Sequence, residues 1–310
     1  MVGRAGMDLA PDPAGTGIDR AVTFLATLGG SAANIAVGIA RLGGEVDLFS
    51  SVSADPVGDF CLNQLADHGV GTSLVFRSSG EARTSLALTE ARMAYHRTVI
   101  YRNNAADFQI TAAQADAIDL AGITTVVVTG TALAIDPSRS AVQALLARAG
   151  EAGVQAVLDI DYRPYSWTSP QDAAETLKRA AGHCAIVTGN EQEFDTLAGR
   201  HGGGLELAAR LAGADGRICI YKRGEQGATT FHAGHRIDTG TWPAAPLKPT
   251  GAGDGFLAAF LTACNGGVAL RDAILRGSAA AAMVVSRPGC APAMPTAREL
   301  DDFIAANQQP

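Results

Sequence analysis

The sequence predicts an α/β protein with a mostly parallel central sheet covered by helices and a small antiparallel sheet beside it. Between residues 111 and 306, short apolar runs alternate with alanine-rich helical stretches, which is typical of parallel strands that are buried on both faces. Residues 70–108 differ, because three strand-like runs follow one another there without a long helix between them. Such a segment is expected to form an antiparallel flap.

Before residue 110 we expect short strands and two helices. Apolar and β-branched runs predict the strands, which are at residues 3–8, 23–26, 46–52, 74–76, 84–88 and 98–101. Apolar periodicity predicts helices from Ser31 to Gly43 and from Asp55 to about His68. Asn34 lies in the first turn of the first helix, where it either caps the helix or points at a ligand.

Beyond residue 110 the predicted strands and helices alternate. Strands are expected at residues 124–129, 154–161, 184–188 and 217–221, followed by a hairpin of residues 228–231 with 236–238. Helices are expected at residues 138–150, 170–182, 191–213 with a break at glycines 202–204, 253–265, 269–285 and 296–306.

Bulk composition limits the possible functions. The 310 residues are 47% hydrophobic, which is enough for a sizeable core in one large domain. The net charge of −7 and the lack of a basic run argue against nucleic acid as a partner. No apolar run reaches the roughly 18–20 residues of a membrane span, so we expect a soluble cytoplasmic protein without a membrane partner. The five cysteines lie far apart in the sequence, which argues against a disulfide framework.

Polar side chains follow each of three predicted parallel strands. They are Asp159, Asp161, Tyr162 and Arg163 after the first, Asn190, Glu191 and Glu193 after the second, and Lys222, Arg223 and Gly224 after the third. In open α/β sheets, ligands bind beyond the carboxyl ends of the strands. This series of acids, amide, arginine, lysine and glycine therefore favours a site for a nucleotide and its phosphates.

A glycine-rich turn precedes the apolar helix predicted at 253–265. Residues 248–256 read Lys-Pro-Thr-Gly-Ala-Gly-Asp-Gly-Phe. Glycine allows close backbone approach, and the first N–H groups of a helix can bind phosphate. Asp254 could then accept the proton of a hydroxyl that attacks the phosphate. The alternative is an ordinary tight turn in which Asp254 only caps the helix.

Three common catalytic motifs are missing from the sequence. It has no G-x-x-x-x-G-K-[ST] loop, no G-x-G-x-x-G after the first strand and no G-x-S-x-G elbow. A P-loop enzyme is thereby excluded, and a nicotinamide-dependent dehydrogenase or a serine hydrolase is disfavoured.

Three ordered motifs resemble those of the pfkB family of carbohydrate kinases, also called the ribokinase family. Residues 29–36, continuing to 55–58, resemble its N-terminal signature. Residues 190–193 are similar to its N-x-x-E motif, and residues 251–254 to its C-terminal G-A-G-D signature. The resemblance extends over nearly the whole chain.

The resemblance implies a ribokinase-like three-layer sandwich forming one kinase domain over residues 1–310. A small β-lid would be built from about residues 8–28 and 70–108, and would close to exclude water from the γ-phosphate. Because lids of the family often pair between subunits, the resemblance also implies a possible homodimer through the lid.

The resemblance further implies ATP and Mg²⁺ as cofactors and assigns roles to individual residues. Asp254 would be the catalytic base, and the N–H groups of Gly251, Ala252 and Gly253 would form an anion hole for the γ-phosphoryl group. The sugar would be held by Asp8, Gly30, Asn34, Arg102 and Arg163. The nucleotide would be held by Asn190, Lys222, Gly224, Gly227, Gly251 and Gly253. Glu193 would act on Mg²⁺ indirectly, through water.

Lys248 and Pro249 stand where many members of the family carry an Asp-Thr pair that helps to bind a monovalent cation. The resemblance therefore leaves potassium binding open. The Lys-Pro form, together with residues 3–13, 101–107 and 159–167, resembles the subgroup that phosphorylates 5-dehydro-2-deoxygluconate in myo-inositol breakdown.

A sugar acid offers a carboxylate, with which Arg102 or Arg163 could pair bidentately. The alternative for each arginine is a structural ion pair. The expected reaction is ATP-dependent phosphorylation of the 6-hydroxyl of 5-dehydro-2-deoxy-D-gluconate. A 2-dehydro-3-deoxygluconate kinase or another sugar kinase of the family is the nearest alternative, and a non-catalytic sugar- or nucleotide-binding regulator on the same fold is the second.

Overall fold

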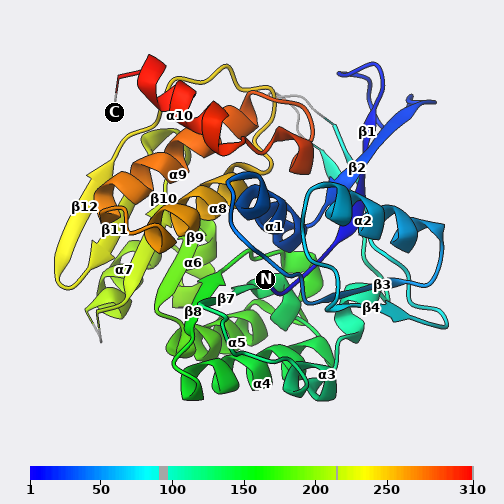
Figure 1. Cartoon of the computed structure of the whole chain (residues 1–310), viewed down its shortest axis with the longest axis horizontal. Coiled ribbons are helices and arrows are strands. Elements are labelled where there is room, and N and C mark those ends of the chain that lie inside the picture. Colours follow the sequence, from blue (N-terminus) through cyan, green and yellow to red (C-terminus); the bar gives the residue numbers. More distant parts are fainter. Residues whose placement is uncertain (91–96, 214–215, 309–310) are drawn as a thin grey trace. The chain divides into compact units, whose positions relative to one another are not determined.

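The computed structural model describes residues 1–90, 97–213 and 216–308 (Figure 1). The chain divides into two compact units. The first unit consists of Met1, Gly3–Asp107 and Thr241–Pro310, and the second of Val2 and Phe108–Gly240.

The second unit contains the predicted parallel sheet. Its strand order is β12-β11-β10-β9-β8-β7, where the strands are β7 (Thr125–Thr129), β8 (Gln155–Asp159), β9 (Ile186–Asn190), β10 (Ile218–Lys222), β11 (Ala228–His232) and β12 (His235–Thr239). Strands β7 to β10 pair in parallel, and β11 and β12 form the expected antiparallel hairpin. The parallel strands are apolar and almost continuously buried, as expected for strands covered on both faces.

One helix precedes the parallel strands of this unit, and the other four described helices join them. They are α3 (Ala112–Asp116), α4 (Ser138–Glu151), α5 (Pro170–His183), α6 (Glu191–Ala198) and α7 (Gly204–Ala212). The break expected at glycines 202–204 separates α6 from α7. Helix α3 was not predicted, because its five residues are too few to show a helical period. Its position is instead marked by a capping box between Thr111 and Gln114.

The first unit contains five α-helices among its described residues. They are α1 (Ser31–Arg41), α2 (Pro56–Asp67), α8 (Ala252–Asn265), α9 (Leu270–Val285) and α10 (Ala297–Ala306), with a 3₁₀ turn, η5 (Ala291–Ala293), before α10. Helix α1 packs on α8, and α8 packs on α9. Small residues permit both approaches, since a Cβ on Gly38 would lie 2.5 Å from Ala258 Cβ, and one on Gly277 would lie 2.9 Å from the Phe256 carbonyl.

The predicted flap corresponds to a four-stranded sheet of order β2-β1-β5-β6 in the first unit. Its strands are β1 (Gly6–Pro11), β2 (Phe24–Gly29), β5 (Leu86–Thr89) and β6 (Thr98–Tyr101). Two of its pairings are antiparallel, whereas β1 and β5 pair in parallel. Residues 91–96 of the expected lid range lie outside the described residues, and the action of this sheet as a lid stays a prediction.

One strand expected in the flap belongs elsewhere. The run at residues 74–76 becomes β4 (Val75–Ser78), which pairs in parallel with β3 (Ser50–Ser53) as a separate two-stranded sheet. Sequence alternation identified the strand correctly but carries no information about its partner.

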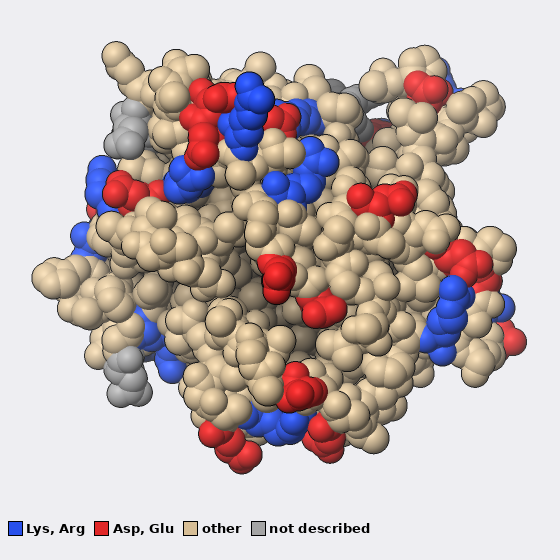
Figure 2. All heavy atoms as spheres, in the orientation of Figure 1, with Lys and Arg blue, Asp and Glu red and all other residues tan. Residues whose placement is uncertain are grey.

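Charged side chains of both signs lie on the surface. On the face in Figure 2, basic and acidic side chains of the described residues are interspersed. Within the part of the chain that the structure describes, no helix is long and apolar enough to cross a membrane. The five cysteines are free thiols.

Gly38→Ala should destabilise the protein, because the new methyl group would overlap the side chain of Ala258 on α8. Overpacking of this kind costs roughly 1–3 kcal/mol. The matched control is Gly150→Ala, since Gly150 lies in α4 with no atom within 4 Å of an added Cβ. Removing that exposed helical glycine should stabilise the protein by roughly 0.5–1 kcal/mol. Denaturant unfolding of both variants would measure the two free energies, and equal stabilities would contradict the close α1–α8 packing.

Candidate active site

The glycine-rich turn opens helix α8 in the first unit. Gly251 is its N-cap and adopts a left-handed conformation, with φ 84° and ψ −7°. The ladder of helical hydrogen bonds starts with the Gly255 N–H donating to the Gly251 carbonyl, so the N–H groups of Ala252 and Gly253 precede it. No side chain caps this N-terminus. The anion-binding role expected for this end of α8 stays a prediction.

Asp254 and Asn34 meet across helices α8 and α1. The Asn34 Nδ2 donates to Asp254 Oδ2 at 2.8 Å. Helix α1 begins at Gly30 with φ 100° and no side-chain cap, so Asn34 does not cap it. Asn34 instead fixes the orientation of the Asp254 carboxylate. The ligand role expected for Asn34 and the catalytic role expected for Asp254 stay predictions.

The oxygen of the Asn34 amide accepts no hydrogen bond from the described residues. This Oδ1 atom is also buried. Because a buried acceptor without a partner costs about 1–3 kcal/mol, such an atom indicates a position where a ligand hydroxyl can donate.

Asp8 supplies a second acceptor of this kind. It lies on β1, and its buried Oδ1 has no hydrogen-bond partner in the described chain. Burial raises the pKa of Asp8, opposed by the positive charges of Arg4 and Lys248. The Arg4 Nη2 is 3.9 Å from Asp8 Oδ1. A Cβ on Gly29 would collide with the Asp8 carboxylate, which gives the Gly29-Gly30 pair of the N-terminal signature a steric role.

Arg102, predicted to bind the sugar, is engaged in a buried ion pair. Its Nη2 donates to Asp107 Oδ2, and the two side chains are 6% and 1% exposed. This arrangement corresponds to the structural alternative that the sequence left open. Breaking a buried pair leaves an uncompensated charge, so Arg102 has a structural function whether or not it also contacts a ligand.

In the second unit, the strand-end residues form an acidic cluster around one lysine. The Lys222 Nζ lies 3.6 Å from Asp159 Oδ1. Burial raises the pKa of Asp159, and so does the Asp161 carboxylate, whereas Lys222 lowers it. Burial likewise raises the pKa of Glu193 to about 7, with Lys222 again opposing and both aspartates adding to the rise. The predicted convergence of these strand ends is therefore confirmed within this unit.

Asp161 holds Arg163 and Thr131 beside this cluster. The Arg163 Nη2 lies 2.9 Å from Asp161 Oδ1, and the Thr131 hydroxyl donates to Asp161 Oδ2 at 3.0 Å. Asp161 has a positive φ of 34°, a backbone conformation that is costly outside glycine and is often found at functional sites. Unlike Arg102, the Arg163 side chain is 46% exposed.

The N-x-x-E motif forms a capping box at the start of α6. The Asn190 Oδ1 accepts from the Glu193 N–H at 2.9 Å, and Glu193 Oε2 accepts from the Asn190 N–H at 2.7 Å. A single motif therefore stabilises the helix end and fixes a buried carboxylate near Lys222. The ligand-binding roles expected for Asn190 and Glu193 stay predictions.

Two glycines shape the loop after β10. Gly224 (φ 56°) opens the 3₁₀ turn η4 (Gly224–Gln226), and Gly227 (φ 81°) ends it. A Cβ on Gly227 would collide with the Thr239 carbonyl, whereas one on Gly224 would meet no atom within 4 Å. Gly227 is thus required by the hairpin, whereas the ligand-binding role expected for Gly224 stays a prediction.

The acidic cluster suits a hydrated Mg²⁺ rather than a dedicated metal cage. Among residues 1–90, 97–213 and 216–308, no group of three His, Cys, Asp or Glu side chains could hold a metal ion directly. Asp159 Oδ1 is nevertheless buried without a hydrogen-bond partner in that part of the chain. Mg²⁺ keeps several waters and binds substrate phosphates, so Asp159 and Glu193 fit an indirect role.

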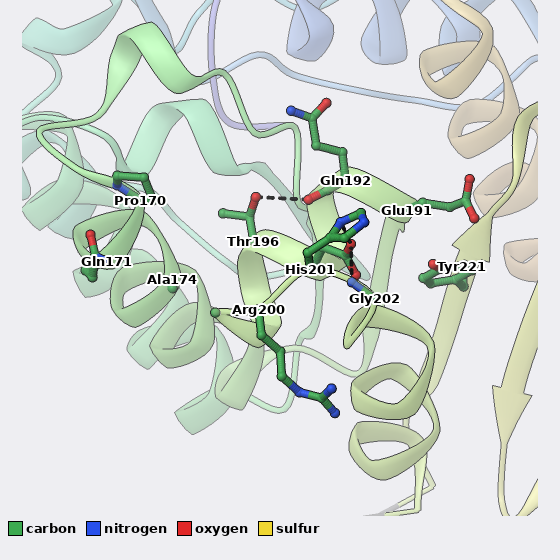
Figure 3. Close-up of a pocket in the computed structure, with 12 residues that line it drawn as sticks. Pro170, Gln171, Ala174, Glu191, Gln192, Thr196, Arg200, His201, Gly202 and Tyr221 are labelled. Carbon is green, nitrogen blue, oxygen red and sulfur yellow. Dashed lines mark hydrogen bonds and ion pairs between the residues drawn. The ribbon is translucent and has the colours of Figure 1, made fainter.

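A separate groove of about 640 Å³ lies on the second unit, between α5, α6 and the α6–α7 connection (Figure 3). Of the polar strand-end residues singled out in the sequence, only Glu191 lines it, and no residue that was assigned a role in binding or catalysis does. Two hydrogen bonds brace its wall, from Thr196 to the Gln192 carbonyl and from the Gly202 N–H to Asp195. The groove thus lies on the face of α6 that carries Gln192, Asp195 and Thr196, not the face that carries Glu193.

Sequence reasoning did not single out Arg4 or Thr131. Arg4 donates to the Ser85 hydroxyl at 2.9 Å and lies beside Asp8, while Thr131 fixes Asp161. Arg4 precedes Asp8 by four residues, but i,i+4 spacing is informative only in a helix. No sequence signal marked Thr131, because its contact depends on β7 and β8 being neighbours.

The sequence profile of the pfkB family of carbohydrate kinases matches residues 1–297. The 5-dehydro-2-deoxygluconokinase of Photobacterium profundum is 38% identical over 315 residues, with 100% of this chain and 95% of the relative covered. The enzyme of the same name from Clostridium tetani is 32% identical, with 99% and 93% covered.

Solved structures confirm the expected ribokinase-like fold. A fructokinase of Vibrio cholerae O395, crystallised with fructose, ADP and calcium, gives a TM-score of 0.86 at 26% identity, covering 98% of this chain and 97% of that one. A ribokinase-like protein of E. coli in complex with ATP and Mg²⁺ gives a TM-score of 0.88 at 22% identity, covering 98% of both chains, and bears on the fold alone.

Glu193→Gln should change how stability depends on pH. The Glu193 carboxyl ionises near pH 4.5 in an ordinary environment and near 7 in the folded protein. Between these values the folded state holds more protons than the unfolded state, so the free energy of unfolding falls as pH rises through the window. Across this window the free energy of unfolding of the wild-type protein should fall by roughly 1–3 kcal/mol more than that of Glu193→Gln.

Glutamine can still accept the Asn190 N–H, so the variant keeps the capping box. Glu191→Gln, at an exposed position of the same helix turn, is the matched control and should follow wild type. Denaturant unfolding across the pH window measures all three proteins. Parallel pH curves for wild type and Glu193→Gln would contradict the buried state of this carboxyl.

Proposed function

The chain belongs to the pfkB family of carbohydrate kinases, and from this membership we propose that it phosphorylates the 6-hydroxyl of 5-dehydro-2-deoxy-D-gluconate with ATP. Relatives of that activity, 32–38% identical over nearly their whole length, support the substrate. Within the site, one observation carries the proposal. Asp8 Oδ1 and Asn34 Oδ1 are buried acceptors without a hydrogen-bond partner among the described residues. Asn34 also orients the Asp254 carboxylate.

Asp254 is the proposed base. The Asn34 Nδ2 donates to its Oδ2, which favours the ionised, accepting form of the carboxylate. Asp254 would take the proton of the 6-hydroxyl as its oxygen attacks the γ-phosphorus. General-base catalysis of this kind contributes about 10²–10⁴-fold.

The N-terminus of α8 is the proposed anion hole. The N–H groups of Gly251, Ala252 and Gly253 would donate to the phosphoryl oxygens as negative charge develops on them. The left-handed turn at Gly251 and the lack of a side-chain cap on this helix support this assignment, since a capping side chain would occupy the same donors.

Sugar hydroxyls would donate to the two unpartnered acceptors. Gly30 is a further proposed contact, and it has a packing role as well, since a Cβ there would collide with the Arg4 carbonyl. For the carboxylate of a sugar acid, Arg163 is the better candidate than Arg102. The Arg163 guanidinium is about half exposed, whereas that of Arg102 is buried against Asp107.

The nucleotide would be held by residues of the second unit. Asn190, Lys222, Gly224 and Gly227 are the proposed contacts, together with the N–H groups of Gly251 and Gly253. When bound with ATP, Mg²⁺ supplies positive charge that neutralises the phosphates. Glu193 and Asp159 would hold its water ligands, while Lys222 limits the negative charge that these acids build up.

A homodimer through the four-stranded sheet stays a prediction, which the mass in solution would decide. Exposed apolar side chains at both edges of that sheet, Leu25 on β2 and Val99 and Tyr101 on β6, support it.

A substrate panel tests the proposed reaction. Purified protein with ATP and Mg²⁺ would be offered 5-dehydro-2-deoxygluconate, 2-dehydro-3-deoxygluconate, fructose and ribose, and ADP release would be measured. We expect kcat/KM for the first compound to exceed that for the neutral sugars by roughly 10- to 100-fold, because a charged hydrogen bond is worth about 1.5–3 kcal/mol.

Each alternative predicts its own pattern. Preference for 2-dehydro-3-deoxygluconate would keep the carboxylate recognition and change the sugar. Preference for fructose or ribose would refute the sugar-acid subgroup. Absence of turnover with any sugar, despite ADP binding, would favour a regulator on the same fold.

Asp254→Asn should lower kcat by about 10²–10⁴-fold, since asparagine cannot accept the proton. ADP affinity, measured by calorimetry, should change little because the proposed nucleotide contacts remain. The matched control is Asp272→Asn, which alters an exposed aspartate in the first turn of α9 and should leave kcat unchanged. Retention of full turnover in Asp254→Asn would eliminate Asp254 as the base.

A further inference from the structure

The ammonium of Lys248 is buried in the first unit and has no part in the mechanism above. Its side chain is only 4% exposed. The Nζ atom donates to two backbone carbonyls, those of Thr250 at 2.6 Å and Val284 at 3.2 Å. A lysine side chain is seldom buried to this extent unless its charge is compensated.

Negative groups surround this ammonium. Burial lowers the pKa of Lys248, and the charges of Asp254 and Asp8 oppose that fall. Val284 is in the last turn of α9, where the carbonyls of the helix end carry partial negative charge. Two carbonyls, two carboxylates and a helix C-terminus thus partly compensate the burial of this ammonium.

The two carbonyls belong to segments that shape the anion hole. Thr250 directly precedes Gly251, whose left-handed turn starts α8. A Cβ on Gly251 would lie 3.2 Å from both Cys290 Sγ and Val284 Cγ1. The turn is thus packed against the end of α9, and Lys248 joins the same two segments by hydrogen bonds.

We propose that Lys248 is a positioning residue whose ammonium serves as a built-in cation for the anion hole. It ties the Thr250 carbonyl to the C-terminus of α9 and thereby fixes the turn from which the Ala252 and Gly253 N–H groups emerge. It also offsets the repulsion between the carboxylates of Asp8 and Asp254. This role rests on the proposed kinase function and deepens it.

One consequence concerns dissolved monovalent cations. Backbone carbonyls are the ligands from which protein sites for K⁺ are commonly built, and here the tethered ammonium takes up two of them. Wild-type turnover should therefore be the same with K⁺, Na⁺ or a bulky organic cation as the counter-ion. Activation by K⁺ would contradict the built-in cation.

The test compares Lys248→Ala with Lys248→Met. Both remove the charge, but alanine leaves space at the position whereas methionine fills most of it. Both variants should lose kcat by about 10²-fold, because misplacing reacting groups by about 1 Å has an effect of that size. KM for ATP should change much less. Methylammonium or K⁺ should partly restore kcat to Lys248→Ala and not to Lys248→Met.

The control is Lys178→Ala, which removes an exposed lysine on α5 and should leave kcat unchanged. Thermal melting would establish that each variant is folded. If Lys248→Ala does not fold, Lys248→Met alone tests the proposal. Full kcat with this neutral side chain refutes the positioning role. A folded Lys248→Ala whose lost activity no cation restores would reduce Lys248 to packing and also overturn the proposal.

A measurement that needs no catalysis tests the role of Lys248 independently of the proposed reaction. Hydrogen exchange of the amides at residues 251–254 should be faster in Lys248→Met than in wild type, because the turn loses its tie to α9. The kinetic measurements use whichever sugar the wild-type protein phosphorylates. If it phosphorylates none, the proposed reaction is refuted, but hydrogen exchange still tests the role of Lys248. Unchanged exchange in Lys248→Met refutes the positioning role whatever the substrate.

Discussion

The hydrogen bond from Asn34 to Asp254 depends on the close packing of two helices, α1 and α8. Helix α1 can approach α8 because Gly38 faces Ala258 without a Cβ. That approach brings an amide and a carboxylate 220 positions apart in the sequence to 2.8 Å. The orientation of the proposed base, the direction of the unpartnered Asn34 oxygen and the register of the glycine turn all follow from this packing of small residues.

Electrostatics differ between the two units. In the first, Asp8 and Asp254 are accompanied by two cations, Arg4 and Lys248. In the second, Asp159 and Glu193 share Lys222 while Asp161 pairs with the half-exposed Arg163, and burial together with mutual repulsion raises the pKa of Glu193 to about 7. The second unit therefore carries an excess of negative potential at the strand ends, which suits a site that receives a magnesium-bound nucleotide rather than a bare anion.

Hydrophobic periodicity predicted the parallel strands and nearly all the helices, because buried elements of ordinary length leave a clear pattern. Other features depended on contacts that no local pattern encodes. The partner of β4, the pairing of Asn34 with Asp254 and the burial of Arg102 against Asp107 are of this kind. The N-x-x-E motif shows a further limit, since a capping box and a ligand site need the same residues at the same spacing.

The positive-φ glycines at the starts of α1 and α8 also bear on protein engineering. Several helices of this chain begin with a side-chain cap, such as Asp55, Ser169 and Thr296, whereas α1 and α8 begin with Gly30 and Gly251. Adding caps is a common route to thermostability. Here it suits α4, α7 and α9, which lack side-chain caps. At α1 the Arg4 carbonyl already accepts from the Ala33 N–H, and at α8 an added capping side chain would compete for the N–H groups that are proposed to bind phosphate.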